Sequence, residues 1–237
     1  MKDYPELTQM LLKNRGIKTK EEAEKFLNPD YDRDTHDPFL ILGMERAVKR
    51  IFGAIEKNEK IVIYSDYDCD GIPGGVVLHD FFQKIGFDNA GVYIPHRHKE
   101  GYGLNHEAID SFAENNTKLM ITVDCGISDV EEVEHAQSLD IDCIVTDHHL
   151  IQEKLPPAYV ILNSKQKDDT YPDDMLCGAG VAYKLVQALL TEARKQKLSW
   201  VDSIPIGWEK WLLDVVGIAT VADMVPLVKE NRVLARY

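Results

Sequence analysis

The sequence has little of what marks small cross-linked, secreted or membrane proteins. Its 237 residues include four cysteines, at positions 69, 125, 143 and 177, and no CxxC spacing, so zinc ribbons and thioredoxin-type motifs are excluded and reduced thiols are expected. No apolar segment follows the charged N-terminus, so no signal peptide is predicted. The longest apolar stretch, residues 211–228, contains Asp214 and Asp223 and is expected to be buried core rather than a membrane span.

Positive charge is also scarce. The chain has 27 Lys and Arg against 40 Asp and Glu, and therefore a formal net charge of −13. Proteins that hold nucleic acid by bulk charge alone have basic surfaces, so this balance argues against that class. An anionic substrate would have to meet a local basic patch or bound metal ions. The 44% of hydrophobic residues are enough for a substantial core in one large domain, with or without a small appendage.

Two patterns divide the chain near residue 58. The first part, 1–58, is expected to be a helical N-terminal extension, with helices over residues 6–15, 19–27 and 43–58. From 59 to 237 short apolar strands alternate with helix-length segments, which predicts βαβ units. The expected strands are residues 60–65, 90–95, 118–124 and 142–147, and the expected helices between them are 75–86, 105–115 and 129–139. The predicted fold class is therefore α/β, a Rossmann-like parallel β-sheet flanked by helices.

Acids and imidazoles follow three of the predicted strands, at the carboxyl ends where ligands bind in such folds. These residues are Asp66, Asp68 and Asp70 after the first strand, Asp124 after the third, and Asp147, His148 and His149 after the fourth. If the chain stayed extended after the first strand, its three carboxylates would share one side at spacings of about 7 Å. Like charges at such spacings repel each other, and a bound cation relieves the repulsion.

The types of donor indicate which cation. Carboxylates and imidazoles without thiolates suit Mn²⁺ or Mg²⁺ better than structural Zn²⁺. Five or six such ligands exceed the needs of one ion with open positions, so we infer a two-metal site, with ions about 3.5–4 Å apart around a phosphoryl centre. A calcium-binding EF-hand is excluded, because Val77 stands where its loop requires a bidentate Glu. The glycine-rich turn at 71–75 lacks both the dinucleotide-binding and the Walker spacing, so it is weak evidence for a phosphate site.

Four segments, in this order, resemble the motifs of the DHH phosphoesterase superfamily, and within it the RecJ-type single-stranded-DNA exonucleases. They are residues 68–70 (DCD), 123–126 (VDCG), 147–149 (DHH) and 220–227 (TVADMVPL). Supporting segments lie at 65–72, 94–104, 171–185 and 217–227, so the resemblance covers nearly the whole chain. Two places depart from it. Tyr64 stands where several DHH proteins have a His four residues before the first Asp of the DxD pair, and Asn163-Ser164 stands where the family commonly has Asn-Pro.

The resemblance implies a set of metal ligands. Asp124 would bind both ions, with the remaining ligands divided into Asp70, His148 and Asp223 on one ion and Asp68 on the other. Catalytic support would come from three further side chains: Asp66 beside the ions, His149 on the scissile phosphate, and Asp147 behind the imidazoles. Substrate contacts would come from Arg97, whose guanidinium matches phosphate oxygens, and from the small turn residues Gly178 and Gly180.

The function implied by the resemblance is a two-metal-dependent 5′-to-3′ single-stranded-DNA exonuclease that uses Mn²⁺ or Mg²⁺ and releases 5′-mononucleotides in DNA repair and recombination. It would be cytoplasmic, away from membranes, with single-stranded DNA, a single-strand-binding protein and a recombination helicase as partners. RecJ-type proteins continue into a DHH-associated domain and an OB domain, so residues 59–237 would be the DHH phosphoesterase catalytic domain and the chain a fragment.

Two other functions stay open. One is a short-oligonucleotide or nucleotide phosphoesterase, or a pyrophosphatase, of the same superfamily. The other is a non-enzymatic DHH-fold scaffold in a replication assembly.

Overall fold

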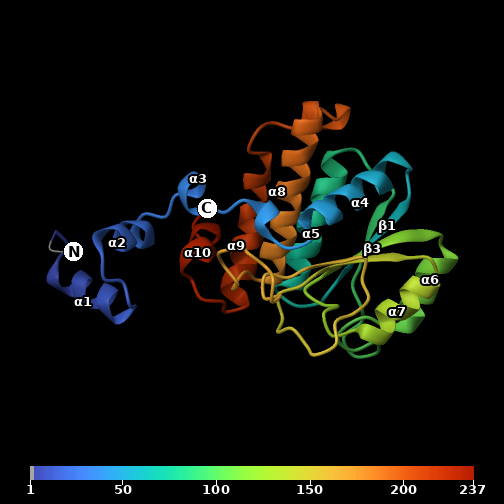
Figure 1. Ribbon diagram of the computed structural model, residues 1–237, viewed down its shortest axis with the longest axis horizontal. Coiled ribbons are helices and arrows are strands. Elements are labelled where there is room, and N and C mark those ends of the chain that lie inside the picture. The colour runs from blue at the N-terminus through green and yellow to red at the C-terminus, as the bar shows by residue number, and fades with distance from the viewer. Residues whose placement is uncertain (1–2) are drawn as a thin grey trace.

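The computed structural model describes residues 3–237, and a five-stranded parallel sheet lies at the centre of this part of the chain (Figure 1). The strands are β1 (Lys60–Ser65), β2 (Ala90–Tyr93), β3 (Thr117–Val123), β4 (Asp142–Thr146) and β5 (Val160–Leu162). They lie in the order β2-β1-β3-β4-β5, and each neighbouring pair is parallel. The direction of winding reverses between β1 and β3, so the carboxyl ends of these two strands flank the crevice where such folds bind ligands.

Helices cover both faces of the sheet, because successive residues of a strand point to opposite sides and here both sides are apolar. Ile61 and Ile63 of β1 belong to the core under one set of helices, whereas Val62 and Tyr64 belong to the core on the other face. The first set is α4 (Met44–Glu56), α5 (Gly71–Lys84) and α8 (Gly178–Gln196), and the second is α6 (His106–Glu114) and α7 (Val130–Ser138). Figure 1 shows the two layers above and below the strands. The predicted α/β class is confirmed.

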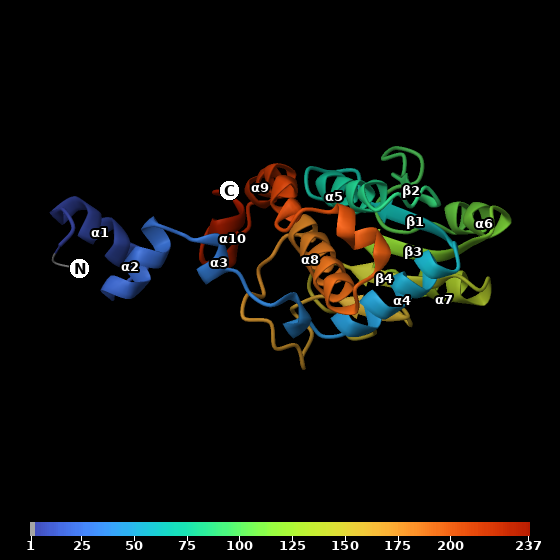
Figure 2. The same cartoon turned by 90° about the horizontal axis from the view of Figure 1, so that it is seen from above.

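The first two helices lie away from this body, at one end of the molecule (Figure 2). They are α1 (Glu6–Asn14) and α2 (Lys20–Leu27), followed by the short α3 (Tyr31–Asp34). Helix α2 begins with a capping box, in which the Thr19 hydroxyl accepts from the N–H of Glu22 and the Glu22 carboxylate accepts from the N–H of Thr19. The guanidinium of Arg232, on α10 (Lys229–Leu234), packs over the ring of Phe26 at 3.8 Å and so joins α2 to the body.

Helix α4 departs from the simple division at residue 58. Met44, Ala47 and Ile51 are buried in the main core beneath the sheet, so α4 packs as part of the α/β body rather than with α1 and α2. The division of the chain into 1–58 and 59–237 remains a prediction.

The apolar stretch 211–228 is less buried than expected. It contains α9 (Leu213–Ala222), which directly follows a 3₁₀ turn at Trp208–Leu212. Two other 3₁₀ turns lie at Pro38–Leu40 and Ser199–Ser203. Leu213, Val216 and Ala219 are buried, but Ile218 is 63% exposed and Met224 86% exposed. The expected buried core is found on one side of α9 only, and the other side of this helix is exposed at Ile218. Among residues 3–237, no helix combines the length and the apolar character needed to cross a membrane.

Candidate metal centre

The acids and imidazoles that follow the strands meet at the carboxyl edge of the sheet. Asp66 follows β1, Asp124 follows β3, and His148 comes two residues after the end of β4. Asp223 joins them from the C-terminal end of α9. Three sets of donor atoms, each within 4.8 Å of one another, are formed by Asp70, His148 and Asp223, by Asp66, Asp68 and Asp124, and by Asp124, His148 and His149. The sets share members, so they form one continuous cluster.

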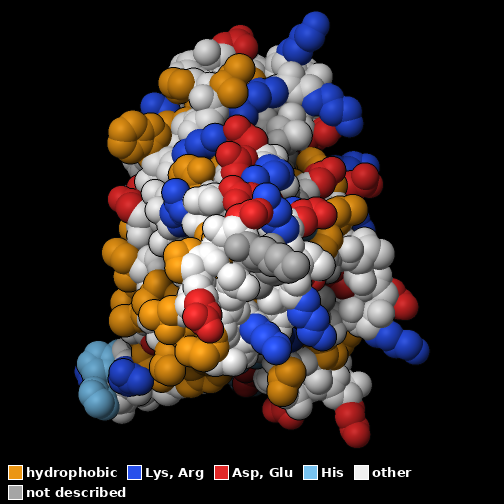
Figure 3. All heavy atoms as spheres, turned by 90° about the vertical axis from the view of Figure 1, so that its left-hand side faces the viewer, with side chains coloured by type: hydrophobic (Ala, Val, Ile, Leu, Met, Phe, Trp, Pro, Cys, Tyr) orange, Lys and Arg blue, Asp and Glu red, His pale blue; other side chains and the backbone are white. Residues whose placement is uncertain are grey.

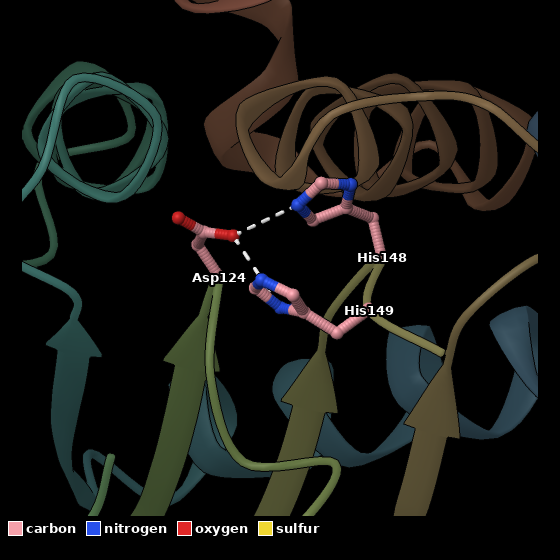
Figure 4. A group of neighbouring side chains, drawn as sticks. All are labelled: Asp124, His148 and His149. Atoms are coloured by element: carbon pink, nitrogen blue, oxygen red, sulfur yellow. Dashed lines mark ion pairs between the residues drawn. The ribbon is translucent and has the colours of Figure 1, made fainter. Parts of the chain in front are cut away.

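Asp124 stands at the centre of this cluster (Figure 4). Its backbone has a φ of +61°, which turns the chain sharply at the end of β3. Its Oδ1 lies 3.2 Å from Nε2 of His148 and 3.9 Å from Nδ1 of His149. This oxygen is buried, yet it accepts no hydrogen bond from any residue of the described chain, and the same holds for Oδ1 of Asp66. Buried carboxylate oxygens without partners are costly unless another group satisfies them.

The pKa values reflect this shortage of partners. Burial, followed by repulsion from Asp70 and Asp68, raises the pKa of Asp124 to about 10. Burial also raises the pKa of Asp70 and of Asp66, and burial lowers the pKa of His148. These shifts all disfavour the charged forms, and divalent cations among the carboxylates would favour the ionised acids again.

His149 is held differently. Its Nδ1 lies 2.7 Å from Oδ1 of Asp147, and this hydrogen bond raises the pKa of His149 to about 9. Burial alone would raise the pKa of Asp147, but the charge and hydrogen bonds of His149 together with the N–H of Ile127 lower it. Asp147 also accepts from the N–H groups of Ile127, His148 and His149, so its position is fixed by the backbone. His149 is therefore a cation near neutral pH, with its ring orientation set by Asp147.

The turn after β1 differs from the extended chain considered for it. The strand ends at Ser65 and the chain turns, so that Asp68 Oδ1 accepts from the N–H groups of Asp70 at 2.8 Å and Gly71 at 2.9 Å. A Cβ on Gly71 would come within 2.5 Å of the Asp66 carbonyl oxygen, so only glycine permits this turn. The assumed alternation is wrong here, because the chain turns after Ser65 and the turn itself gathers the carboxylates at the start of α5.

The N-terminus of α8 supports Asp70. The N–H groups of Gly178 and Ala179 donate to its two carboxylate oxygens at 2.5 and 2.7 Å, and the helix dipole favours this negative charge. A Cβ on Gly178 would lie 2.6 Å from Cβ of Asp124. This close approach requires a glycine at position 178. Gly178 and Gly180 are both buried. A role for either glycine in binding substrate stays a prediction.

The His148–His149 turn is held by Asn163, which the sequence marks only as a departure from the family's Asn-Pro, and by Lys165, which it does not mark. The Asn163 side-chain amide donates to the carbonyl of His149 at 2.9 Å, and Lys165 Nζ donates to the carbonyl of His148. Asn163 directly follows the short strand β5. The sequence contains a signal for Asn163, since a polar residue after an apolar run also marks the other strand ends. Tyr64, the other departure from the DHH pattern, donates to the carbonyl of Gly103 at 2.9 Å on the other face of the sheet, away from the carboxylates.

Arg97 is exposed on the loop after β2. Its guanidinium carbon lies 4.7 Å from the centre of the Tyr67 ring, in the turn that carries Asp66 and Asp68. The cation–π contact keeps this side chain beside the acidic turn. Its contact with substrate stays a prediction.

Comparison with known proteins agrees with this geometry. The family described as "DHH family, N-terminal domain" matches residues 60–218. The chain belongs to the DHH family. Its DHH-family relatives include the single-stranded-DNA-specific exonuclease RecJ of Bacillus subtilis, 43% identical over 97% of this chain and 27% of the relative. RecJ of Escherichia coli is 37% identical over 98% of this chain and 39% of the relative. The chain therefore spans well under half the length of these relatives.

Solved structures of DHH-family proteins show the same fold. Exonuclease RecJ bound to manganese is 30% identical, with a TM-score of 0.70, over 82% of this chain and 46% of that chain. RecJ from Thermus thermophilus in complex with Mn²⁺ is 26% identical, with a TM-score of 0.73, over 96% of this chain and 30% of that chain.

Proposed function

We propose that this chain is the catalytic portion of a two-metal-dependent exonuclease that degrades single-stranded DNA from 5′ to 3′ and releases 5′-mononucleotides. The observation that carries the proposal is the cluster at the sheet edge, where buried carboxylate oxygens of Asp66 and Asp124 lack hydrogen-bond partners in the described chain. Membership of the DHH family and likeness to RecJ exonucleases give the substrate class.

The residues fit two divalent ions. Asp70, His148 and Asp223 would hold one ion, because His148 Nε2 lies 3.7 Å from an oxygen of each acid. Asp68 would hold the other, with Asp66 beside it and Asp124 shared between the two. A set of carboxylate oxygens and imidazole nitrogens without thiolates suits Mn²⁺ or Mg²⁺. RecJ structures with manganese support this choice.

The remaining residues act on the phosphodiester itself. When bound, the two ions supply Lewis-acid stabilisation of the charge on the phosphoryl oxygens. His149, protonated and held at Nδ1 by Asp147, keeps its Nε2–H free to donate to a phosphate oxygen as negative charge grows there. Arg97 binds a neighbouring phosphate with its planar guanidinium.

The proposal extends to the organisation and setting of the protein. Residues 59–237 act as the DHH catalytic domain and 1–58 as a helical N-terminal extension. The protein works in the cytoplasm, in DNA repair and recombination, with a single-strand-binding protein and a recombination helicase as partners. These attributes rest on the likeness to RecJ.

The test is hydrolysis of a 5′-labelled single strand by the chain with Mn²⁺, compared with Asp124→Ala. We expect the variant to retain less than about a thousandth of the wild-type rate, since it removes the carboxylate shared by both ions. Asp88→Ala, at an exposed acid on the loop before β2, is the control and should keep the full rate. Equal rates for wild type and Asp124→Ala would contradict the assignment of the site.

A second candidate is hydrolysis of short oligonucleotides, nucleotides or pyrophosphate. It is favoured by the net charge of −13 and by the face of the molecule in Figure 3, where Lys and Arg side chains are interspersed with Asp and Glu rather than gathered in one basic track. Turnover of a long strand, a dinucleotide and pyrophosphate by the same preparation separates the two. A preference for the last two would replace the exonuclease proposal.

A further inference from the structure

A pocket of about 310 Å³ opens beside the metal centre, with Asp147 and His149 in its lining. Its lining includes Tyr102, Ser128, Leu150 and Gln152 together with His149. Its size is at the lower end of the range for small-molecule sites. None of the three metal-ligating sets uses it except through His149, so its shape needs another explanation.

Tyr102 forms a wall of this pocket and is held at both ends. Its hydroxyl donates to the carbonyl of Asp124 at 3.2 Å, and its ring meets the His149 ring edge-on, with centroids 6.1 Å apart. The glycines on either side, Gly101 and Gly103, have φ values of +80° and +84°. A Cβ on Gly103 would lie 2.8 Å from the carboxylate of Asp129, so the loop packs tightly there. The side chain is nevertheless 55% exposed. Tyr102 therefore lines the pocket with an aromatic ring that is anchored at its hydroxyl and stays more than half exposed.

The chemistry of the other walls suits a flat, apolar ligand. Leu150, 73% exposed, offers aliphatic surface. The acids in the lining are already occupied: Asp129 accepts from the N–H of Leu104 at 2.9 Å, and Asp147 accepts from His149 and from the backbone. The Tyr102 ring and Leu150 therefore offer a flat ligand stacking and apolar contact, while the two lining acids are engaged by the protein itself.

We propose that this pocket binds a nucleobase next to the scissile phosphate, by stacking on the ring of Tyr102. The proposal rests on the exonuclease function, which places a phosphate at His149 and hence a nucleoside within reach of the adjoining pocket. Stacking tolerates every base, because each base has an aromatic face, and an enzyme that removes successive nucleotides must accept all four. Tyr102 is then a determinant of substrate class, selecting strands that carry bases but not particular sequences.

The test compares a normal single strand with one whose two 5′-terminal nucleotides lack bases. We expect wild type to favour the normal strand by about 10-fold in kcat/KM. Tyr102→Leu should lose about that factor on the normal strand and change little on the baseless one, whereas Tyr102→Phe, which keeps the ring, should retain the preference. Tyr237→Leu removes a tyrosine of similar exposure, 54%, at the end of the chain and should behave as wild type. Equal losses on both strands for Tyr102→Leu, or no preference in wild type, would overturn the proposal.

A binding measurement separates this proposal from the exonuclease function. A strand with 2-aminopurine at its 5′ end is mixed with protein in EDTA, where hydrolysis is not expected. We expect fluorescence quenching by wild type and Tyr102→Phe, and its loss in Tyr102→Leu, because quenching reports stacking. Quenching that depends on Tyr102 but comes without hydrolysis in Mn²⁺ would contradict the exonuclease function and support the pocket. Quenching that is absent in wild type, or unchanged in Tyr102→Leu, would overturn the pocket.

Discussion

Two clusters of buried charge in this chain differ in how their needs are met. In the first, Lys184 on α8 and Glu230 on α10 are both fully buried, with Nζ and Oε1 2.9 Å apart. Lys184 also donates to the carbonyl of His36, and the hydroxyl of Tyr171 donates to Glu230. Every charge in this cluster has a partner of opposite sign or a hydrogen bond from the protein itself.

The metal centre is arranged in the opposite way. Its carboxylates outnumber its imidazoles, and buried oxygens of Asp66 and Asp124 have no hydrogen-bond partner among the described residues. A buried cluster that satisfies itself stabilises the fold or fixes its geometry. One left unsatisfied costs stability and is retained where a ligand completes it. The difference between the clusters therefore separates a structural role from a binding role within one molecule.

The largest expected effect comes from disturbing the satisfied cluster. Lys184→Met leaves the Glu230 carboxylate buried without its cation, and we expect the free energy of unfolding in urea to fall by about 3–5 kcal/mol. Lys184→Met combined with Glu230→Leu should recover most of this loss, because no charge then remains unpaired. A single variant as stable as wild type would mean that the pair is not the structural element described here.

A smaller effect is expected from crowding the unsatisfied cluster. Gly178→Ala would place a Cβ 2.6 Å from Cβ of Asp124, and a displacement of about 1 Å at a catalytic group can lower the rate about 100-fold. Gly53→Ala is the control, since a Cβ at this position in α4 would meet no other atom within 4 Å. Hydrolysis rates of the two variants at equal Mn²⁺ test this. Equal activity in both would show that the contact with Asp124 does not position it.

A third expected effect concerns the pH dependence of the stability of the metal-free protein. The pKa of Asp124 in the folded chain, about 10, lies above its ordinary value, so the folded state keeps a proton that the unfolded state releases. Stability should therefore fall as pH rises from about 4 toward 10, by at most about 1.4 kcal/mol per pH unit. Urea unfolding at pH 5 and pH 8 should show a shallower decline in Asp124→Asn. Asp88→Asn, at an exposed acid, should match wild type, and an unchanged slope in Asp124→Asn would contradict the assignment.

Much of the sheet could be predicted from the sequence, because each long strand is an apolar run that ends in a polar residue. The expected strand at 60–65 coincides with β1, and that at 142–147 with β4 to within a residue. Strand β5 was not predicted, since its three residues, Val160–Leu162, are too few to show a period. The exposure of Ile218 on α9 and of Met224 just after it could not be predicted from the sequence either. Hydrophobicity alone does not show which side of an apolar helix is covered.

The residues of the site could be predicted from the sequence, but the contacts that position them could not. Motif order located the acids and imidazoles that the structure brings together, including Asp223 from a distant helix. The N–H groups of Gly178 and Ala179 on Asp70 and the amide of Asn163 on His149 join residues that lie apart in sequence, so helix and strand periodicity does not predict these contacts. The turn after Ser65 is local, with Asp68 accepting from Asp70 and Gly71, but it breaks the alternation of an extended chain.

The unsatisfied cluster is expected to bind two cations and the satisfied one none. Calorimetric titration of Mn²⁺ into EDTA-treated and dialysed protein tests this most directly. We predict two ions per chain for wild type and for Gly53→Ala, and weakened or lost binding of both in Asp124→Asn, which alters the carboxylate they share. A wild-type chain that binds no Mn²⁺, or an Asp124→Asn variant that binds two ions with unchanged affinity, would contradict the claim.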